Sequence, residues 1–393
     1  MRKFDFRYII GLFLSWRSIL FIAALLAGIV IPVFGNRFPY WDRVLTVTNL
    51  PNWVWGFGNF DGVHYLKIAQ NGYGSNLSQA FFPLYPYLIK IFNIFPKNAS
   101  LDLQIFVDPS YFFTAMILST VFFIFALYFL AKLWQENYGS KKVLLSILLL
   151  CSFPTAFYFG AVYSESLLLL LIVLCFYFAK KGKYFWAGIT SALASVTKIQ
   201  GVLLFPFLAI ELFLRYRKEK FKFSKRLLFD FVGVLLSPSG LIAYMLYLQK
   251  SMGDWLYFLS AQPGFGAERS ALPIILLPQV FYRYLKIFFS VNIFSLSFFN
   301  AFLEFSMTIA VIVILILAFK KMKFSYWFFS ILAVILPTLT GTLSSMPRYV
   351  LLAFMVIPWL VNKYNRSVKY IIIVQSLLQI ILLGLFVRGY WVS

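Results

Sequence analysis

Histidine, cysteine and acidic residues are scarce in this chain of 393 residues. It has one histidine, two cysteines and 13 acidic residues, against 35 lysines and arginines. Cys151 and Cys175 both fall within long apolar runs, so they supply neither a disulfide framework nor a metal site. No set of metal ligands can be assembled around a single histidine either.

Charge is also sparse. Charged residues make up 12% of the chain, whereas 62% of its residues are hydrophobic and the mean hydropathy is +0.84. Because a water-soluble surface needs more charge than this, the sequence predicts an all-α polytopic membrane protein. Apolar runs of about 20 residues predict about 11 transmembrane helices. They lie at 17–35, 110–131, 143–161, 164–179, 184–197, 201–215, 227–248, 300–319, 324–341, 349–362 and 370–389.

The net charge of +22 is concentrated in loops at alternate ends of these spans. The positive-inside rule makes these loops cytoplasmic, together with the N-terminus, and an odd number of spans then leaves the C-terminus outside. The basic residues therefore mark one side of a membrane, and no nucleic-acid partner is expected. The basic clusters lie at 2–17, 141–142, 180–183, 215–226, 320–323 and 363–369.

Two long polar stretches, residues 36–109 and 249–299, fall on the predicted outer side. Since no soluble domain or repeat separates from the spans, one integral membrane domain over residues 1–393 accounts for the chain. Residues 273–299 within the second stretch predict a re-entrant or interfacial segment, because charges there would be costly at mid-bilayer. Long outer loops place the expected function on the outer face.

The first outer loop predicts two short structural segments. Residues 62–70 have the pattern of an amphipathic helix that ends at Gly72. Residues 81–95 are apolar, too short to span easily and interrupted by proline, which suits a segment lying in the membrane interface.

Asp61 and His64, the only histidine, are one helical turn apart in this loop, so a helix would place them on one face. Asp61 could cap the start of the helix, or it could act as a general base toward an acceptor hydroxyl, and the two roles can coexist. His64 could be a hydrogen-bonded packing residue or could contact a phosphate or a sugar hydroxyl.

Three further corners between predicted spans lie on the outer side. Glu165, which follows Ser164, could start a helix or could have a functional role at the membrane boundary, where ionisable groups are costly. Lys198 could contact a lipid phosphate or only extend toward the interface. Arg348, in a tight turn, suits two-pronged phosphate binding. With Asp61, these corners predict an anionic, lipid-linked substrate at the outer surface.

Residues 61–73 (DGVHYLKIAQNGY) and 80–86 (AFFPLYP) resemble the first luminal loop of the PIG-V family. These mannosyltransferases add the second mannose in GPI-anchor synthesis, and the family has prokaryotic relatives. Residues 163–166 (YSES) resemble another block of the family, and the likeness thins toward the Arg348 corner. The chain departs from the family pattern at Phe60, where a tryptophan is usual, and at 198–201 (KIQG), where an Arg-Ser-Asn-Gly-like block is usual.

The resemblance implies a GT-C glycosyltransferase fold and an inverting transfer of a sugar, mannose above all, from a polyprenyl-phosphate donor. Dolichol phosphate mannose is such a donor. It implies that Asp61 lies at the catalytic centre and that no nucleotide-sugar pocket is present. The expected substrate-binding residues are His64, Tyr65, Glu165, Lys198, Gln200 and Arg348.

The same reading sets the expected partners and location. The partners are the polyprenyl-phosphate sugar donor, a glycan or glycolipid acceptor and membrane lipids. No cofactor is expected, since the lipid-phosphate sugar is a substrate, and no divalent metal is expected. A prokaryotic protein would lie in the plasma membrane and a eukaryotic one in the endoplasmic reticulum, with the active site on the outer or luminal face.

Two other classes of protein share these features. A transporter or flippase of lipid-linked saccharides would need charged groups along a path at mid-span. Glu211, Asp230 and Glu304 are the candidates, and each lies near the end of a predicted span. A non-catalytic membrane scaffold is the third alternative, and the polar pattern of the first loop argues against it.

Overall fold

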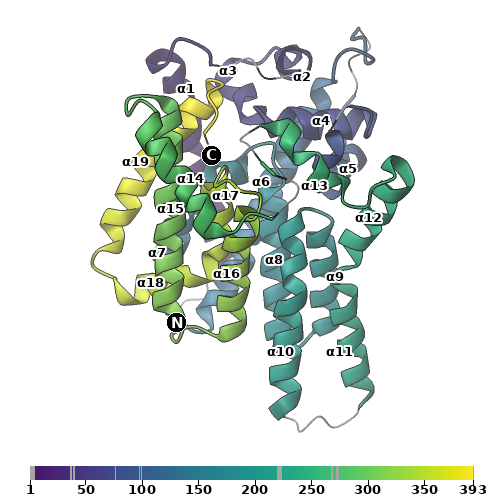
Figure 1. Ribbon diagram of the computed structural model, residues 1–393, viewed down its shortest axis with the longest axis vertical. Helices are drawn as coiled ribbons and strands as arrows, with labels where there is room; N and C mark the ends of the chain where they lie inside the picture. The colour runs from purple at the N-terminus through teal and green to yellow at the C-terminus, as the bar shows by residue number, and fades with distance from the viewer. Residues whose placement is uncertain are drawn as a thin grey trace. The chain divides into compact units, whose positions relative to one another are not determined.

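The computed structural model describes residues 5–35, 38, 40–75, 77–96, 98, 100–218, 224–266, 269–270 and 274–392 (Figure 1). These residues are helical or irregular, and within the described ranges the only β-bridge is the isolated pairing of Ile275 with Thr340. The predicted all-α architecture is therefore confirmed. The basic clusters predicted at 2–17 and 215–226 fall partly outside the described residues.

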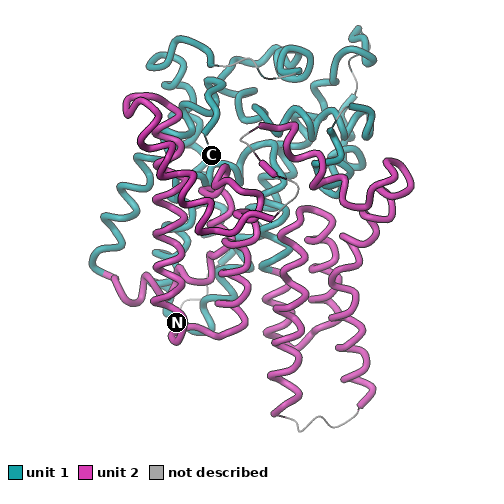
Figure 2. Tube along the Cα trace, in the orientation of Figure 1, with its two compact units in different colours: residues 1–173, 366–392 teal, residues 174–365, 393 magenta. Residues whose placement is uncertain are grey.

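The chain forms two compact units (Figure 2). Unit 1 contains residues 1–173 and 366–392, and unit 2 contains residues 174–365. The first boundary falls inside helix α8 (Glu165–Lys180), so one continuous helix belongs to both units. The single domain expected over residues 1–393 stays a prediction.

Unit 1 is built on three long apolar helices. They are α1 (Phe6–Val30), α6 (Pro109–Gln135) and α19 (Val368–Val387), and α1 packs against the other two. Helix α6 starts with a side-chain cap, because the Asp108 carboxylate accepts a hydrogen bond from the Ser110 amide at 2.8 Å. The shorter helix α7 (Ser140–Cys151) packs against α6 and α19, and the 3-10 helix η4 (Ala156–Gly160) follows it.

The first outer loop folds into a series of short helices, of which α4 (Asp61–Asn71) and α5 (Leu84–Phe92) pack together and against α6. Helix α4 matches the helix predicted at 62–70. It ends at Gly72, whose φ of 72° favours glycine. The remaining elements of the loop are α2 (Trp41–Val44), η1 (Thr46–Thr48), α3 (Asn52–Trp55), η2 (Gly56–Gly58) and η3 (Ser78–Ala80).

The first part of unit 2 is a cluster of helices around α9 (Tyr184–Ser195). Helix α9 packs against α10 (Leu204–Lys218), α11 (Lys225–Leu236) and α12 (Ser239–Met252), and the 3-10 helix η5 (Ile199–Leu203) precedes α10. Glycine lets α9 and α11 meet backbone to backbone, since a Cβ atom on Gly188 would lie 1.7 Å from the Gly233 carbonyl oxygen. Helices α11 and α12 meet at a bend of 41°.

The second part of unit 2 centres on α15 (Leu296–Ala318), which packs against α14 (Leu277–Ser290), α16 (Phe324–Thr338) and α17 (Met346–Tyr349). The other elements are α13 (Tyr257–Ser260), η6 (Gln262–Phe265), η7 (Val350–Val356) and α18 (Ile357–Lys363).

The lengths and compositions of the helices bear on the predicted number of membrane spans. Among the described residues, five helices are long and apolar enough to do so, or six if the bent pair α11–α12 counts as one span. The predicted count of eleven is not confirmed, because several predicted spans are short helices. Helices α7 and α9, for example, have 12 residues each, whereas a span needs about 20.

Candidate active site

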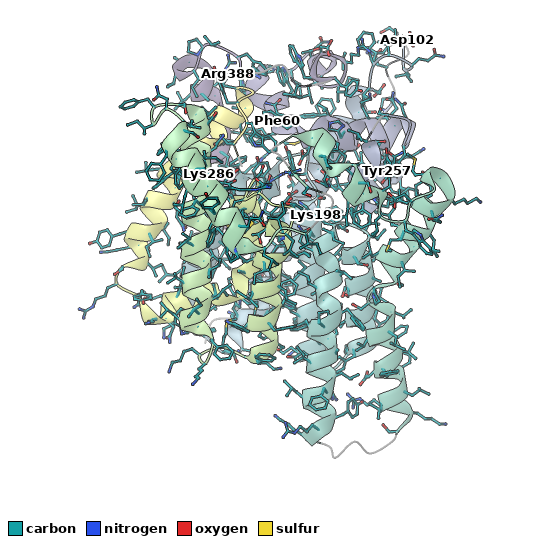
Figure 3. The ribbon with its side chains drawn as sticks, in the orientation of Figure 1. Phe60, Asp102, Lys198, Tyr257, Lys286 and Arg388 are labelled. Atoms are coloured by element: carbon teal, nitrogen blue, oxygen red, sulfur yellow. The ribbon has the colours of Figure 1, made fainter. Side chains whose placement is uncertain are left out.

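Asp61 is the first residue of helix α4 in unit 1, and the backbone before it is strained. Phe60 takes the cap position with φ 57° and ψ −113°, which L-residues rarely adopt, and its side chain makes no capping hydrogen bond. The Phe60 ring centroid lies 4.8 Å from that of Phe38, 5.7 Å from Phe386 and 5.0 Å from Trp391 (Figure 3). Packing thus holds the strained turn that orients Asp61.

Asn59 fixes the same turn through hydrogen bonds to distant segments. Its side-chain amide donates to the carbonyl oxygens of Phe386 at 2.7 Å and Val387 at 3.3 Å, at the end of α19. Its own carbonyl oxygen accepts a hydrogen bond from the Tyr163 hydroxyl at 2.8 Å. The Asn59 side chain is fully buried, and its Oδ1 has no hydrogen-bond partner among the described residues.

His64 lies one turn after Asp61 and is packed between aromatic rings. It stacks on Phe81 with a centroid separation of 4.8 Å and meets Tyr40 edge-on at 6.2 Å. Burial lowers the pKa of His64 from 6.5 to about 4, against the opposing effect of the Asp61 charge, and Lys67 lowers it further. His64 is therefore neutral at pH 7 and can both donate and accept a hydrogen bond.

The block that begins at Val162 lies directly against α4 within unit 1. A Cβ atom on Gly62 would come 3.3 Å from the Val162 carbonyl oxygen. The Val162 amide donates to the Phe57 carbonyl oxygen at 3.0 Å, and the Tyr65 hydroxyl lies 3.0 Å from Ser164 Oγ. Two segments about a hundred residues apart in the sequence thus pack together, and Tyr65 takes part in this contact.

Glu165 follows Ser164 as the first residue of α8, and its side chain is buried. Its negative charge acts on Tyr85 of helix α5. Burial raises the pKa of Tyr85, the hydrogen bond with Ser119 opposes that rise, and the charge of Glu165 adds to it. Tyr85 is fully buried and its hydroxyl lies 2.8 Å from Ser119 Oγ. Glu165 is therefore a buried acid beside a tyrosine that stays protonated.

The other predicted residues gather in unit 2. Lys198 Nζ lies 5.2 Å from the centroid of the Tyr349 ring, within the range of a cation–π contact (Figure 3). Arg348 is buried in α17, where its Nη2 donates to Ser345 Oγ at 2.8 Å. Gln200, in η5, is also buried, and its Oε1 has no hydrogen-bond partner among the described residues.

A buried network within unit 2 supports the turn before Arg348. The Tyr284 hydroxyl of α14 donates to the Glu304 carboxylate of α15 and accepts from the Leu343 amide at 3.1 Å. Ser345, two residues later, has φ 67°. Because Leu343 and Ser345 directly precede α17, this network fixes the turn from which Arg348 extends.

The predicted site residues therefore fall into two groups. Residues of α4 and the start of α8 come together in unit 1, and residues of η5 and α17 with Lys198 belong to unit 2. Asp61, His64, Tyr65 and Glu165 form the first group, and Lys198, Gln200 and Arg348 form the second. The described ranges contain no group of three or more histidine, cysteine or acidic residues suited to a metal ion, and the expectation that no divalent metal takes part stays a prediction.

Sequence reasoning missed the residues that hold Asp61 in place. Asn59 lies two residues before the motif at 61–73, and its hydrogen-bond partners Phe386, Val387 and Tyr163 are far away in the sequence. Arg388 was also missed: it donates to the carbonyl oxygens of Ile31 at 2.8 Å and Pro32 at 2.7 Å, and to Asn52 Oδ1 at 2.7 Å (Figure 3). A basic residue at the outer end of the last predicted span, against the positive-inside pattern, was the signal that could have found it.

The three acids that are candidates for a transport path all have hydrogen-bonding or ion-pair partners within unit 2. Each is buried and has a polar partner on another turn or helix. The pairs are Glu211 with Lys323 at 2.5 Å, Asp230 with the Tyr216 hydroxyl at 2.9 Å, and Glu304 with Tyr284. This arrangement gives the transporter alternative no support.

Comparison with curated proteins gives no match. Comparison with protein families does: the model of the family described as mannosyltransferase (PIG-V) matches residues 42–381. This range includes the Asp61 and Glu165 blocks and the Arg348 corner, and it confirms the resemblance seen in the sequence. Together with the long apolar helices, it identifies an integral membrane glycosyltransferase. The chain belongs to the mannosyltransferase (PIG-V) family.

Proposed function

We propose that the protein transfers mannose from a polyprenyl-phosphate donor to a lipid- or glycan-type acceptor, with inversion, and that its fold is of the GT-C class. This proposal rests on the geometry around Asp61. A carboxylate at the start of a helix is held by a strained residue, Phe60, and a buried side chain, Asn59, next to a neutral histidine. Strain kept at one position by surrounding contacts is typical of functional sites.

Asp61 acts in this proposal as the general base. The acceptor hydroxyl oxygen forms a bond to the anomeric carbon from the face opposite the phosphate, and its proton passes to the Asp61 carboxylate. The bond between the anomeric carbon and the phosphate oxygen breaks, and its electron pair leaves with the polyprenyl phosphate. Since phosphate is a capable leaving group, no general acid is required. His64, Tyr65 and Glu165 would contact sugar or acceptor hydroxyls.

Lys198 and Arg348 would contact the donor phosphate. Arg348 suits this role because its guanidinium is buried and already oriented by Ser345, so a two-pronged contact would cost little ordering. Lys198 would add a second positive charge, and Gln200 an amide next to it. Both cations would offset the charge that develops on the departing phosphate.

The proposed location follows from the charge pattern. Basic loops mark the cytoplasmic side, so the first outer loop and its catalytic residue face outward. In a prokaryote this is the outer face of the plasma membrane, and in a eukaryote the lumen of the endoplasmic reticulum. The apolar residues Ile91 and Phe92 of α5, both more than half exposed, suit contact with the membrane interface beside the site.

The test is sugar transfer by the purified protein from polyprenyl-phosphate mannose to a panel of glycan and glycolipid acceptors. Asp61→Asn keeps the size of the side chain but cannot accept the proton, so the rate should fall by roughly a hundredfold or more. Thermal stability and donor binding should persist. Asp102→Asn is the matched control, because Asp102 is an exposed acid of the same loop, and its transfer rate should stay unchanged.

Arg348→Lys should have a different signature, since it keeps the charge and loses the two-pronged contact. We expect weaker donor binding, measured as a higher KM for the donor, or a lower kcat from poorer stabilisation of the leaving phosphate. Undiminished transfer by Asp61→Asn would refute the catalytic assignment. Movement of lipid-linked mannose across vesicles without any transfer would instead favour a flippase.

A further inference from the structure

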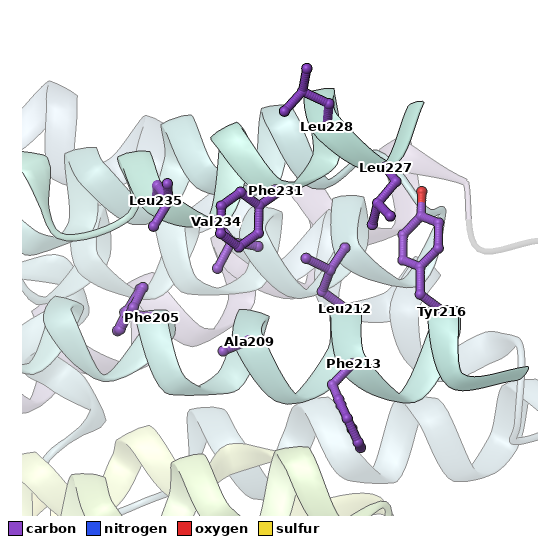
Figure 4. Close-up of a pocket in the computed structure, with 10 residues that line it drawn as sticks. All are labelled: Phe205, Ala209, Leu212, Phe213, Tyr216, Leu227, Leu228, Phe231, Val234 and Leu235. Atoms are coloured by element: carbon purple, nitrogen blue, oxygen red, sulfur yellow. The ribbon is translucent and has the colours of Figure 1, made fainter. Parts of the chain in front are cut away.

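Helices α10 and α11 of unit 2 border an apolar groove, with a cavity of about 480 Å³ (Figure 4). Leu212, Tyr216 and Val234 form its buried floor, whereas Phe213 and Leu228 at its sides are 52% and 54% exposed. The only polar side-chain atom in the lining is the Tyr216 hydroxyl, which donates to Asp230. The groove thus offers an apolar ligand contact and almost no hydrogen bonds.

The groove is half as long as a membrane is thick. Its lining on α10 extends from Phe205 to Tyr216, a separation of eleven helical steps, which at 1.5 Å per step is about 16 Å. The hydrocarbon core of a bilayer is about 30 Å thick. The groove therefore matches the depth of one leaflet and suits a chain that enters from one membrane surface.

Charge distinguishes the two ends of the groove. At the Tyr216 end, exposed basic residues stand on both helices, namely Arg217 and Lys218 on α10 and Lys225 and Arg226 on α11. The one acid on α11, Asp230, is buried and accepts a hydrogen bond from Tyr216, and its Oδ2 lies 3.9 Å from Nε of the exposed Arg226. Toward the Phe205 end, residues 231–248 of α11 and α12 carry no charge. The nearest charged residue before Phe205 in the sequence is Lys198, whose Nζ lies 5.2 Å from the centroid of the Tyr349 ring. An anionic headgroup therefore fits at the Tyr216 end.

We propose that this groove is a binding site for an anionic phospholipid. One acyl chain would lie along α10 and α11, and the phosphate would contact the basic residues at the Tyr216 end. This inference does not depend on the sugar-transfer chemistry, and it assigns the groove to a structural lipid of one leaflet. A zwitterionic lipid lacks the net negative charge that those residues attract.

Photocrosslinking on the unaltered protein tests where the chain lies. The protein is placed in phosphatidylcholine nanodiscs with phosphatidylglycerol that carries a photoreactive acyl chain, and the labelled peptides are identified by mass spectrometry. Label should appear on residues 205–216 and 227–235, and excess unlabelled phosphatidylglycerol, but not phosphatidylcholine, should remove it. Label spread evenly over the apolar surface would overturn the proposal.

Variants test the site by native mass spectrometry of bound phosphatidylglycerol. Ala209→Trp should fill the groove and abolish binding, whereas Leu246→Trp, on an exposed apolar position of α12, should not. Removing two charges with Lys218→Ala and Lys225→Ala should weaken binding by roughly tenfold or more, and Lys320→Ala with Lys321→Ala should not.

Three results would contradict the proposal. They are equal binding by Ala209→Trp and Leu246→Trp, equal affinity for phosphatidylcholine and phosphatidylglycerol, and preferential displacement of phosphatidylglycerol by polyprenyl phosphate. The last would assign the groove to the donor's class of lipid. If Ala209→Trp does not fold, the crosslinking result on the unaltered protein decides.

Discussion

Asp61 and His64 share a helix face, but their surroundings give them different chemistry. Asp61 stands at the start of α4, where the helix dipole favours its negative charge. His64 is enclosed by Phe81 and Tyr40, and this burial keeps its ring neutral. The sequence predicts their shared face from the spacing alone. It could not predict the state of His64, because Phe81 and Tyr40 reach it from other segments of the loop.

The neutrality of His64 predicts a dependence of stability on pH. Because its pKa is about 4 in the folded protein and 6.5 when unfolded, the unfolded chain binds the proton first as the pH falls. Its contribution is complete above pH 6.5 and is lost between pH 6.5 and 4, by about 3 kcal/mol in total. Thermal unfolding in detergent should show this loss for the unaltered protein and not for His64→Gln. Equal losses in both proteins over that range would refute it.

The end of helix α19 holds the first outer loop in place. Asn59 bonds to carbonyl oxygens at its last turn, and Arg388 bonds to Ile31, Pro32 and Asn52. Asn59 therefore ties the turn before Asp61 to α19, and Arg388 ties the end of α19 to the segment after α1 and to α3. These hydrogen bonds join the end of α19 to two separate points of the loop, Asn52 and Asn59.

Arg388→Ala should destabilise this arrangement. It removes three hydrogen bonds made by a charged group, so we expect the free energy of unfolding to fall by roughly 1–3 kcal/mol. Sugar transfer should fall as well, because Asp61 loses its fixed position. Arg366→Ala is the control, since Arg366 is an exposed basic residue just before the other end of α19. Similar melting temperatures for the two variants would show that the Arg388 hydrogen bonds contribute nothing.

Long continuous apolar runs such as those of α1, α6, α15 and α19 could be predicted as helices from the sequence, and so could the short α4 with its glycine stop. Interrupted runs could not. The predicted span at 143–161 is in fact α7 followed by η4, and that at 349–362 is divided among α17, η7 and α18. Hydropathy averaged over about 20 residues does not register these breaks, because the short segment 152–155 (SFPT) lies between two apolar runs and the residues from Val350 to Ile357 are apolar throughout.

At the scale of the whole chain, the positions of the charges distinguish the predicted cytoplasmic side from the side of the candidate catalytic acid. Exposed basic residues collect in the loops of one predicted side, whereas the few buried acids bond to neighbours inside their own unit. The candidate catalytic acid is instead in the first loop, at the predicted outer side. Sequence reasoning found this distribution, but the contacts that hold each site residue came only from the fold.

The charge distribution predicts that the first loop lies outside and the basic corner at Lys321 lies in the cytoplasm. Single cysteines at Ser75 and Lys321 test this, because the native Cys151 and Cys175 are buried and should react little with an impermeant maleimide. In intact cells or sealed vesicles of known orientation, Ser75→Cys should be labelled from the outside and Lys321→Cys only after permeabilisation. The reverse pattern would place Asp61 on the cytoplasmic side. The donor would then have to present its sugar at the cytoplasmic face instead of the outer face. That result would overturn the proposed location of transfer, while the role of Asp61 as a base would still stand on the transfer assay.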